Sequence, residues 1–490
     1  MVSVSEKVRV VPVIGLEVHA QLATSSKMFC PCATTFAAEP NSATCPVCLG
    51  FPGTLPVVNR EAVTLAIRFG LAAGGTIDRR SSFARKNYFY PDLPKGYQIT
   101  QYDHPIVTGG AIEIETADGV RDVRLVRAHL EEDAGKSLHE NPFPDVPDTV
   151  TLVEWNRAGV PLLEIVSEPD LRSAAEAMAY LTELRRLLRT LSISEANMEE
   201  GNLRCDANVS VRDSESDPLG TRVEIKNMNS IRNVGRAIEH EIERQAERRA
   251  AGERIVQETR LFDAASGETR VMRSKEEAHD YRYFPEPDLG VLEIPEEWIA
   301  EVRSTLRETP REKRRRFRTI YALPAADAEL LSSSRSLSEY FETVAASVAP
   351  RLAASWVTGE VLRWMKDQKL SAEETNRFSV PPSALVELLE FVASGELSVS
   401  AAKVVFEEMV RSDRRAPEVV REKGLTRVSD ESSLSAAVEA VLRDNPSQVA
   451  QYRAGKTAAF GWFVGQAMKV TGGRADPETL RRLLKERLET

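Results

Sequence analysis

Four cysteines lie within 19 residues of one another near the start of the chain: Cys30, Cys32, Cys45 and Cys48. They form two close pairs, C-x-C and C-P-x-C, separated by twelve residues. Two thiolate pairs at this spacing are typical of a tetrahedral structural Zn²⁺ site that has no open coordination position. Four unrelated buried cysteines are the alternative, and their clustering disfavours it. We therefore predict a structural zinc site that takes no part in catalysis.

A second set of candidate ligands is acidic and is spread along the sequence. It consists of Glu17, His19, His129, Glu131, Glu132, Asp133, Glu164, Glu199, Glu200 and Asp206. Carboxylates with an imidazole suit Mg²⁺ or Mn²⁺, which in proteins usually accompanies a nucleotide phosphate. Composition alone favours another interpretation, in which solvated acids pair with the many arginines. Glu164 resists that interpretation, because an acid inside the apolar run Val160–Val166 needs a partner.

Two other groups are weaker candidates. Gly135-Lys136-Ser137 resembles the end of a phosphate-binding loop, but the position five residues before Gly135 is Leu130 instead of glycine. If ATP binds to this chain, it binds on another fold. Cys205 lies on the apolar side of an alternating segment, which favours a place in the core.

The elements that must position these residues are predicted from hydrophobic periodicity. Strict alternation predicts strands at residues 13–22, 203–211 and 223–226. A 4-3-4-3 apolar spacing over residues 177–191 predicts an amphipathic helix, opened by a capping box at Ser173 and Glu176. These patterns predict an α+β fold: a mixed N-terminal cradle domain with a β-sheet and flanking helices, followed by two smaller all-helical domains.

Breaks in the pattern predict the domain boundaries. From about residue 296 the sequence reads as helices interrupted by prolines, and a second break falls near residues 412–417. We predict domains at 1–293, 294–412 and 413–490. The basic run Arg311–Arg318 favours a solvated helix face over a binding site.

Composition and charge limit the class of protein. The chain has 490 residues, 42% hydrophobic and 28% charged, which is ordinary for a globular protein of several domains. No apolar run of 18 residues and no signal-peptide pattern is present, so we expect a cytoplasmic protein. The net charge of −10 argues against a general coat for nucleic acid. Residues 446–490, however, carry 8 Lys/Arg against 4 Asp/Glu, which predicts local contact with a polyanion.

Several long motifs together resemble one protein family. They span residues 16–19, 85–92, 131–136, 156–165, 199–208, 226–230, 280–288 and 461–469. These segments closely resemble the B subunit of the tRNA-dependent amidotransferase, the GatB family, over essentially the whole chain. One departure is Glu154-Trp155, where the family pattern has Asp and a smaller residue; we expect a local change in packing there.

The resemblance implies a carbon–nitrogen ligase that uses glutamine as amido donor. It would convert Glu-tRNA(Gln) to Gln-tRNA(Gln), or Asp-tRNA(Asn) to Asn-tRNA(Asn), with ATP and Mg²⁺ activating the side-chain carboxylate. The catalytic residues predicted by match to the family are Glu17, His19, Glu132, Glu164 and Asp206. Of these, His19, Glu132 and Asp206 are expected to bind Mg²⁺. Their charge and neighbourhood make Lys136 and Arg204 the expected phosphate contacts.

Ammonia must come from a partner, because the sequence lacks both a Gly-Gly-Ser-Ser-Gly amidase segment and a Cys/His glutaminase arrangement. The resemblance implies a heterotrimer with a glutaminase A subunit, a small C subunit and a tunnel for ammonia. Lys86 and Lys95 either line that passage or lie at the surface. The tail, residues 413–490, resembles a tRNA-binding module, with docking to the other subunits as its alternative.

Two other functions stay open on the residues alone. The chain could be a non-catalytic scaffold that presents misacylated tRNA to a partner, or a stand-alone carboxylate–amine ligase that uses free ammonium. The strand faces that carry acids and a histidine favour the enzyme over the scaffold.

Overall fold

The structure, a computed structural model, describes residues 10–35, 39–138, 147, 149–274, 281–425, 431–471 and 475–489. It consists of two compact units, Met1–Arg311 and Glu312–Thr490, here called the sheet unit and the helical unit. The predicted α+β class is confirmed, because the strands of a large sheet lie in the first unit and helices make up the second. None of the helices in the described part of the chain has the length and apolar character that a membrane span requires.

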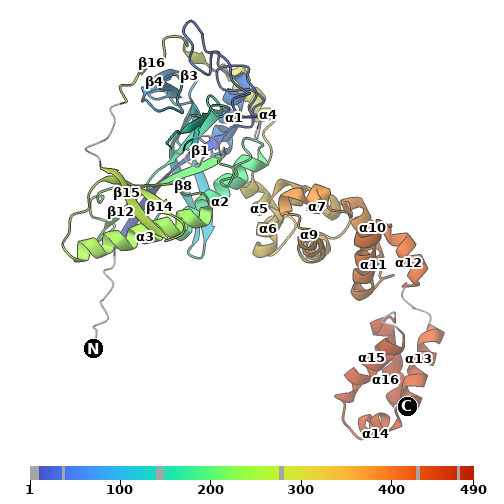
Figure 1. The fold of residues 1–490 in the computed structure, drawn as a ribbon. Helices are drawn as coiled ribbons and strands as arrows, with labels where there is room; N and C mark the ends of the chain where they lie inside the picture. The colour runs from blue at the N-terminus through green and yellow to red at the C-terminus, as the bar shows by residue number, and fades with distance from the viewer. Residues whose placement is uncertain are drawn as a thin grey trace. The chain divides into compact units, whose positions relative to one another are not determined.

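The sheet unit is built around one large, mainly antiparallel sheet (Figure 1). Its strand order is β15 (Glu268–Ser274), β14 (Glu258–Asp263), β13 (Val223–Lys226), β12 (Leu203–Arg212), β1 (Val11–Gln21), β11 (Pro161–Ser167), β8 (Gly119–Glu132), β5 (Tyr97–Gln101), β4 (Phe83–Asn87) and β16 (Phe284–Pro285). Strands β2 (Thr76–Ile77), β6 (Val107–Thr108) and β7 (Ala111–Thr116) are attached beside β8, and β13 with β14 is a parallel pair. Two small sheets pair β9 (Lys136–Leu138) with β10 (Leu152–Glu154), and β3 (Arg80–Ser81) with β17 (Leu292–Glu293). The three predicted strands are confirmed as β1, β12 and β13.

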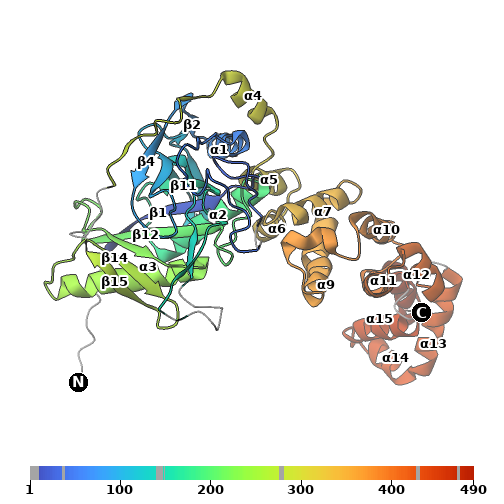
Figure 2. The ribbon, with the colours of Figure 1, turned by 45° about the horizontal axis from the view of Figure 1, so that its top comes forward.

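Helices cover one face of this sheet, and that side holds the core. They are α1 (Arg60–Ala72), α2 (Ala174–Thr190) and α3 (Ile231–Ala250), and α4 (Glu296–Ser304) packs on α1. Figures 1 and 2 show α2 and α3 side by side along the sheet. Every second residue of the central strands, such as Leu16, Val18 and Cys205, is buried in the same hydrophobic cluster as these helices. Because side chains alternate along a strand, the intervening polar residues of β1 and β12 point to the opposite face.

Helix α2 begins as the sequence predicts, with one difference. The Ser173 hydroxyl accepts a hydrogen bond from the Glu176 backbone N–H at 3.1 Å, so Ser173 is the N-cap. The Glu176 carboxylate, however, accepts from the backbone N–H of Arg172 at 2.8 Å and pairs with Arg121 at 3.0 Å. The bond from Glu176 therefore reaches one residue further back than in a standard capping box.

The helical unit contains two hydrophobic clusters. The first is formed by α5 (Pro310–Thr319), α6 (Ala325–Leu331), α7 (Arg335–Ala345), α8 (Pro350–Trp356), a π-helical turn (Val357–Val361), α9 (Leu362–Asp367), a 3₁₀ turn (Ala372–Arg377), α10 (Pro382–Ala393), α11 (Val399–Ser412) and α12 (Ala416–Lys423). The second is formed by α13 (Glu431–Asp444), α14 (Pro446–Arg453), α15 (Ala459–Val470) and α16 (Pro477–Glu489). Helix α4 contributes Trp298 to the core of the sheet unit. The predicted boundaries at 293 and 412 stay predictions.

The basic run in α5 differs from its sequence-based interpretation. Lys313 and Arg316 pair with Glu342 at 3.1 and 2.5 Å, and Arg314 is buried and pairs with Glu329. A solvated face is therefore the wrong interpretation for these three cations. Their acidic partners lie on α6 and α7, which periodicity within α5 could not reveal.

Candidate functional site

The acidic and histidine side chains meet because of the register of antiparallel strands. His19 of β1 lies opposite Glu164 of β11 on one side and Arg204 of β12 on the other. Glu164 in turn lies opposite His129 of β8. Residues directly opposite each other in an antiparallel pair share a face of the sheet. The face without α2 and α3 therefore carries one continuous row of ionisable groups across four strands.

The centre of this row is compact. His19 Nε2 lies 3.2 Å from Glu164 Oε2 and 3.5 Å from Glu131 Oε1. His129 Nε2 lies 3.5 Å from Glu164 Oε2, and all these groups are buried or nearly so. Ligand atoms of His19, Glu131 and Glu164 fall within 4.8 Å of one another, a spacing that one cation can bridge. The partners that Glu164 was predicted to need are thus two histidines and Arg127, whose Nη2 lies 3.9 Å from Glu164 Oε1.

Burial and mutual charge shift the pKa values in this group in opposite directions. Burial alone lowers the pKa of His19, but the hydrogen bond to Glu164 and the charge of Glu131 raise it to about 8. Burial lowers the pKa of His129 to about 4. The pKa of Glu131 is raised by burial and by the charge of Glu164, whereas the two histidines hold the pKa of Glu164 below its ordinary value despite burial. Burial and crowding therefore disfavour the charge of Glu131, whereas the neighbouring histidines favour the charge of Glu164.

Glu17 and Asp206 extend the row toward β13. They lie opposite each other across β1 and β12, and the Asn208 side-chain amide donates to Glu17 Oε1 at 2.9 Å. Burial and the charge of Glu164 raise the pKa of Glu17. Lys226 pairs with Asp206, and also with Glu224 at 3.0 Å. At this end of the row, Lys226 is therefore the cationic side chain that contacts the carboxylates.

Glu132 lies away from this group. Its carboxylate pairs with Lys95 and accepts from the Ile99 backbone N–H at 2.9 Å. Because neighbouring strand residues point to opposite faces, Glu131 takes the place beside His19 that was predicted for Glu132. The role of Glu132 as a Mg²⁺ ligand stays a prediction.

Sequence reasoning counted Glu131 and His129 among the acidic candidates but did not select them for the site. The available signal was the alternation of Arg127, His129 and Glu131 along a strand that ends near residue 132. That alternation is hard to recognise, because β8 also carries charged residues at its other end.

The two predicted phosphate contacts differ in their surroundings. Arg204 lies in the row, and its Nη2 is 2.8 Å from Asp133 Oδ1. The charge of Asp133 raises the pKa of Arg204. Gln21 also donates to Asp133, at 2.9 Å. Lys136 is exposed on β9 in a separate two-stranded sheet.

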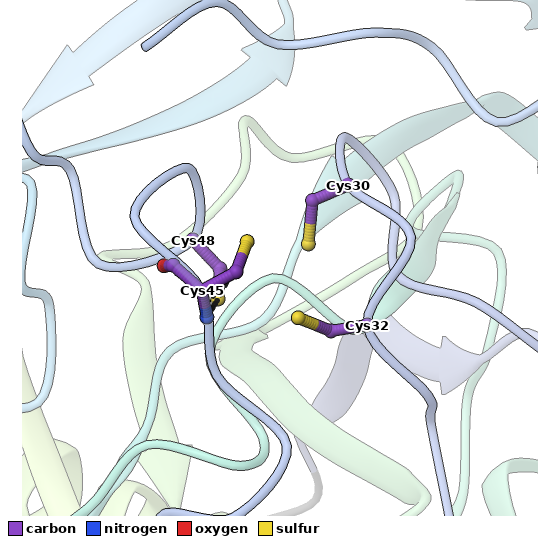
Figure 3. A group of neighbouring side chains, drawn as sticks. All are labelled: Cys30, Cys32, Cys45 and Cys48. Atoms are coloured by element: carbon purple, nitrogen blue, oxygen red, sulfur yellow. Dashed lines mark hydrogen bonds between the residues drawn. The ribbon is translucent and has the colours of Figure 1, made fainter.

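The four cysteines converge from two loops, as their spacing predicts (Figure 3). Their sulfur atoms lie within 4.8 Å of one another, and those of Cys45 and Cys48 are 3.9 Å apart. Sulfurs around a tetrahedral Zn²⁺ with bonds of about 2.3 Å are separated by about 3.8 Å, so the cluster is compatible with a structural metal. A hydrogen bond from Cys30 lowers the pKa of Cys48 to about 5, as expected for four crowded thiols that share protons.

A buried lysine accompanies the cysteines and was not predicted. Lys27 is 1% exposed, and its Nζ lies 3.7 Å from Cys48 Sγ and 3.4 Å from the Trp155 carbonyl oxygen. Four thiolates around one divalent ion leave a net charge of about −2, which a buried ammonium partly balances. Cys30 and Cys48 also line a cavity of ≈ 210 Å³ together with Lys95 and Glu132.

Comparison with known proteins gives a consistent result. A family profile described as GatB/GatE catalytic domain matches residues 12–300, and one described as GatB domain matches residues 339–488. The chain is 52% identical over 481 residues to the B subunit of the aspartyl/glutamyl-tRNA(Asn/Gln) amidotransferase of Thioalkalivibrio sulfidiphilus, with 97% of this chain and 99% of the relative covered. It is 51% identical over 477 residues to the protein of the same name from Geotalea uraniireducens, with 97% and 98% covered. The corresponding protein of Thermodesulfovibrio yellowstonii is 49% identical over 473 residues, with 96% and 98% covered.

Proposed function

This chain belongs to the GatB family, and on that premise we propose that it activates and amidates the side-chain carboxylate of misacylated tRNA in a glutamine-dependent ligase. The products are Gln-tRNA(Gln) from Glu-tRNA(Gln), or Asn-tRNA(Asn) from Asp-tRNA(Asn). The observation that supports this best is the buried group of His19, Glu131 and Glu164, which a divalent cation fits. The relatives carry the names of both tRNA substrates.

The reaction explains why the chain needs this group. Ammonia cannot displace oxide from a carboxylate, so the carboxylate first accepts the γ-phosphoryl group of ATP and becomes an acyl phosphate. The phosphate is then a good leaving group for the attack of ammonia. Mg²⁺ would supply charge neutralisation between the carboxylate and the phosphoryl oxygens.

The residues of the row have separable roles in this proposal. His19, Glu131 and Glu164 hold the cation, and Asp206 and Glu17 enlarge the acidic site on the β12 side. The raised pKa values of Glu17 and Glu131 support this, because carboxylates that repel one another gain most from a bound cation.

Arg204 and Lys226 would contact phosphate in this proposal. Arg204 pairs with Asp133, and Lys226 pairs with Asp206. A cationic side chain at this location can hold the phosphates of the nucleotide while the carboxylate reacts. The predicted phosphate contact at Lys136 stays a weaker part of the proposal, since its strand belongs to a separate sheet.

Glu131 and Glu132 provide a matched pair of variants for the cation site. Glu131→Gln removes a carboxylate beside His19, and Glu132→Gln removes one beside Lys95. We expect Glu131→Gln to weaken Mn²⁺ binding, measured with the spin signal of free Mn²⁺, while Glu132→Gln leaves it within about twofold. The reverse result would restore the predicted ligand set of His19, Glu132 and Asp206.

The other parts of the predicted assembly belong to the same proposal. The chain works in the cytoplasm as one member of a heterotrimer, with a glutaminase A subunit that supplies ammonia and a small C subunit. The four cysteines bind one structural Zn²⁺, and the tail binds tRNA through phosphate contacts. Lys95, in the wall of the cavity beside Glu132, is better placed to line an ammonia passage than Lys86, which lies among aromatic rings.

A direct assay tests the proposal against its alternatives. The chain in complex with its partners is incubated with ATP, misacylated tRNA and ammonium in place of glutamine. We expect amide formation that requires ATP and releases one phosphate per amide. If this chain were a non-catalytic scaffold, its partner would form the amide, and Glu164→Gln in this chain would not lower the yield. A stand-alone ligase would react without the other two chains.

A further inference from the structure

A cluster of tyrosines beside the acidic row combines two segments that are far apart in the sequence. Tyr88 follows β4, Tyr102 follows β5, and Tyr281 and Tyr283 precede β16. We call these four residues the aromatic platform. The rings of Tyr102 and Tyr283 are stacked, with centroids 4.1 Å apart and planes at 6°. Tyr281 makes edge contacts with Tyr88 and Tyr283, both at 6.2 Å between centroids.

The platform is held together by polar contacts. The Asn87 side-chain amide donates to the carbonyl oxygens of Arg282 at 2.8 Å and Tyr281 at 3.3 Å. Arg85 makes a two-point contact with the buried carboxylate of Glu286, at 2.7 and 2.9 Å. These contacts attach residues 281–286 to β4, so the rings have a fixed support.

The platform adjoins the proposed cation site. Thr100 of β5 lies opposite Glu131, and its hydroxyl donates to Glu131 Oε2 at 3.4 Å. Tyr102 follows two residues later, which is about 7 Å along an extended chain. Between platform and site lies Lys86, whose Nζ is 4.9 Å from the centre of the Tyr281 ring. Burial lowers the pKa of Lys86, but the charges of Glu131 and the nearby tyrosines outweigh it.

The exposure of Tyr102 is unusual for a ring that stacks so closely. The residue is 52% exposed, although Tyr283 covers one face of its ring. A flat ring that is covered on one face and open on the other can accept a third planar ring. Base–aromatic stacking of this kind does not depend on hydrogen bonds to the base.

We propose that the aromatic platform binds an adenine base on the open face of Tyr102, next to the site where the carboxylate is activated. This inference rests on the proposed function, whose two large substrates each carry such a base: ATP, and the 3′-terminal adenosine of the tRNA. The shared chemistry is a neutral purine joined to an anionic chain. Lys86, whose ammonium lies beside the Tyr281 ring, suits the negative charge that follows the base.

The test uses Tyr102→Ala, with Tyr102→Phe as its matched control. Tyr102 is exposed, so neither change removes a core side chain, and Phe retains the stacking ring. Dissociation constants are measured on the full complex for four ligands: ATP, inorganic tripolyphosphate, tRNA, and tRNA lacking its terminal adenosine. We expect Tyr102→Ala to weaken one of the two adenine-containing ligands by about 5- to 20-fold, and Tyr102→Phe to restore the affinity.

The ligands without adenine identify the source of the base. If the platform binds ATP, Tyr102→Ala weakens ATP but not tripolyphosphate. If it binds the tRNA end, the variant weakens intact tRNA but not the shortened tRNA. If Tyr102→Ala and the unchanged complex bind ATP and intact tRNA equally well, the proposal is overturned. It is also overturned if Tyr102→Ala weakens assembly of the complex instead of binding of either ligand, because a partner protein would then cover the rings.

Failure of the platform and failure of the proposed function can be told apart. Absence of amide formation in the unchanged complex would defeat the proposed function, whereas the platform is judged on binding alone. Tyr283→Leu provides a second variant, because it removes the ring that stacks on Tyr102. We expect it to produce the same pattern of affinities.

Discussion

The sheet unit contains two groups of metal-binding residue types that are assembled in opposite ways. The cysteine cluster comes from residues 30–48, has one kind of ligand and is accompanied by the buried Lys27. The group of His19, Glu131 and Glu164 comes from three strands, mixes ligand types and shifts the pKa of each member. A closed set of thiolates suits a structural ion, and a crowded set of carboxylates suits an exchangeable one that acts with substrate. We propose that the first group serves folding and the second serves chemistry.

The largest effect should come from the acidic row. Asp206→Ala removes a carboxylate opposite Glu17 and leaves Lys226 with its other partner, Glu224. We expect tRNA-dependent ATP hydrolysis and amide formation to fall together by on the order of 10²-fold or more, as when one electrostatic contact to a phosphoryl transition state is lost. Basal glutamine hydrolysis by the partner glutaminase should persist.

Ammonium serves as the control for Asp206→Ala. It replaces the nitrogen source and leaves carboxylate activation unchanged, so it should not restore amide formation. Recovery of amide formation with ammonium would mean that activation is intact and that Asp206 acts elsewhere.

A different kind of loss should follow from the cysteine cluster. Cys45→Ser removes one of four sulfur ligands, and structural Zn²⁺ contributes directly to folding free energy. We expect bound zinc, measured by elemental analysis, and the melting temperature to fall, while turnover per folded molecule falls far less than in Asp206→Ala. If Cys45→Ser lowers turnover as far as Asp206→Ala does and leaves the melting temperature unchanged, the distinction between the two groups is removed.

The same comparison explains what the sequence could predict. The cysteines were predicted from spacing alone, because their ligand geometry is set within one short stretch. Strands β1, β12 and β13 and helix α2 were predicted from alternation and periodicity, since each has one buried face. The choice between Glu131 and Glu132, and the pairing of His129 with Glu164, depend on the register between β8 and β11. Register between strands that are distant in the sequence is not encoded in local periodicity.

The tail provides a smaller and separable effect. Helix α12 contributes Ala416 and Val419 to the first cluster of the helical unit, so a clean truncation removes residues 426–490 instead of starting at 413. We expect the truncated chain to retain the complex and to bind tRNA about tenfold more weakly at low salt, because phosphate contacts supply affinity. The difference in affinity should shrink as salt rises, because the intact chain makes more phosphate contacts and therefore loses more affinity than the truncated chain. Equal affinity and equal salt dependence for both chains would favour the docking alternative.

The smallest effect should come from Glu360, a carboxylate of the helical unit that already pairs with two cationic side chains. Glu360 pairs with Lys403 at 2.8 Å and Arg363 at 2.5 Å. Burial raises the pKa of Glu360, but these cations outweigh it and hold the pKa below 4.5. Glu360 therefore stabilises the fold above about pH 4.5, and this contribution is lost as the pH falls through its lowered pKa.

We expect Glu360→Gln to lower the free energy of unfolding at pH 7 by less than about 1 kcal/mol, since both cations are half exposed. The difference from the unchanged chain should decrease below pH 4.5, as followed by urea unfolding at several pH values. A constant difference across that range would show that the charge of Glu360 is not the cause.

One measurement tests the central claim, that carboxylate activation belongs to the strand-built group and not to the cysteine cluster. The substrate is misacylated tRNA with ¹⁸O in the side-chain carboxylate, and the product phosphate is analysed by mass spectrometry with ammonium as the nitrogen source. The unchanged complex and Cys45→Ser should both transfer ¹⁸O to phosphate, in proportion to folded protein, because acyl phosphate breakdown leaves one carboxylate oxygen on phosphorus. Glu164→Gln, checked for folding, should transfer almost none. Labelled phosphate from Glu164→Gln at the unchanged rate would contradict the account.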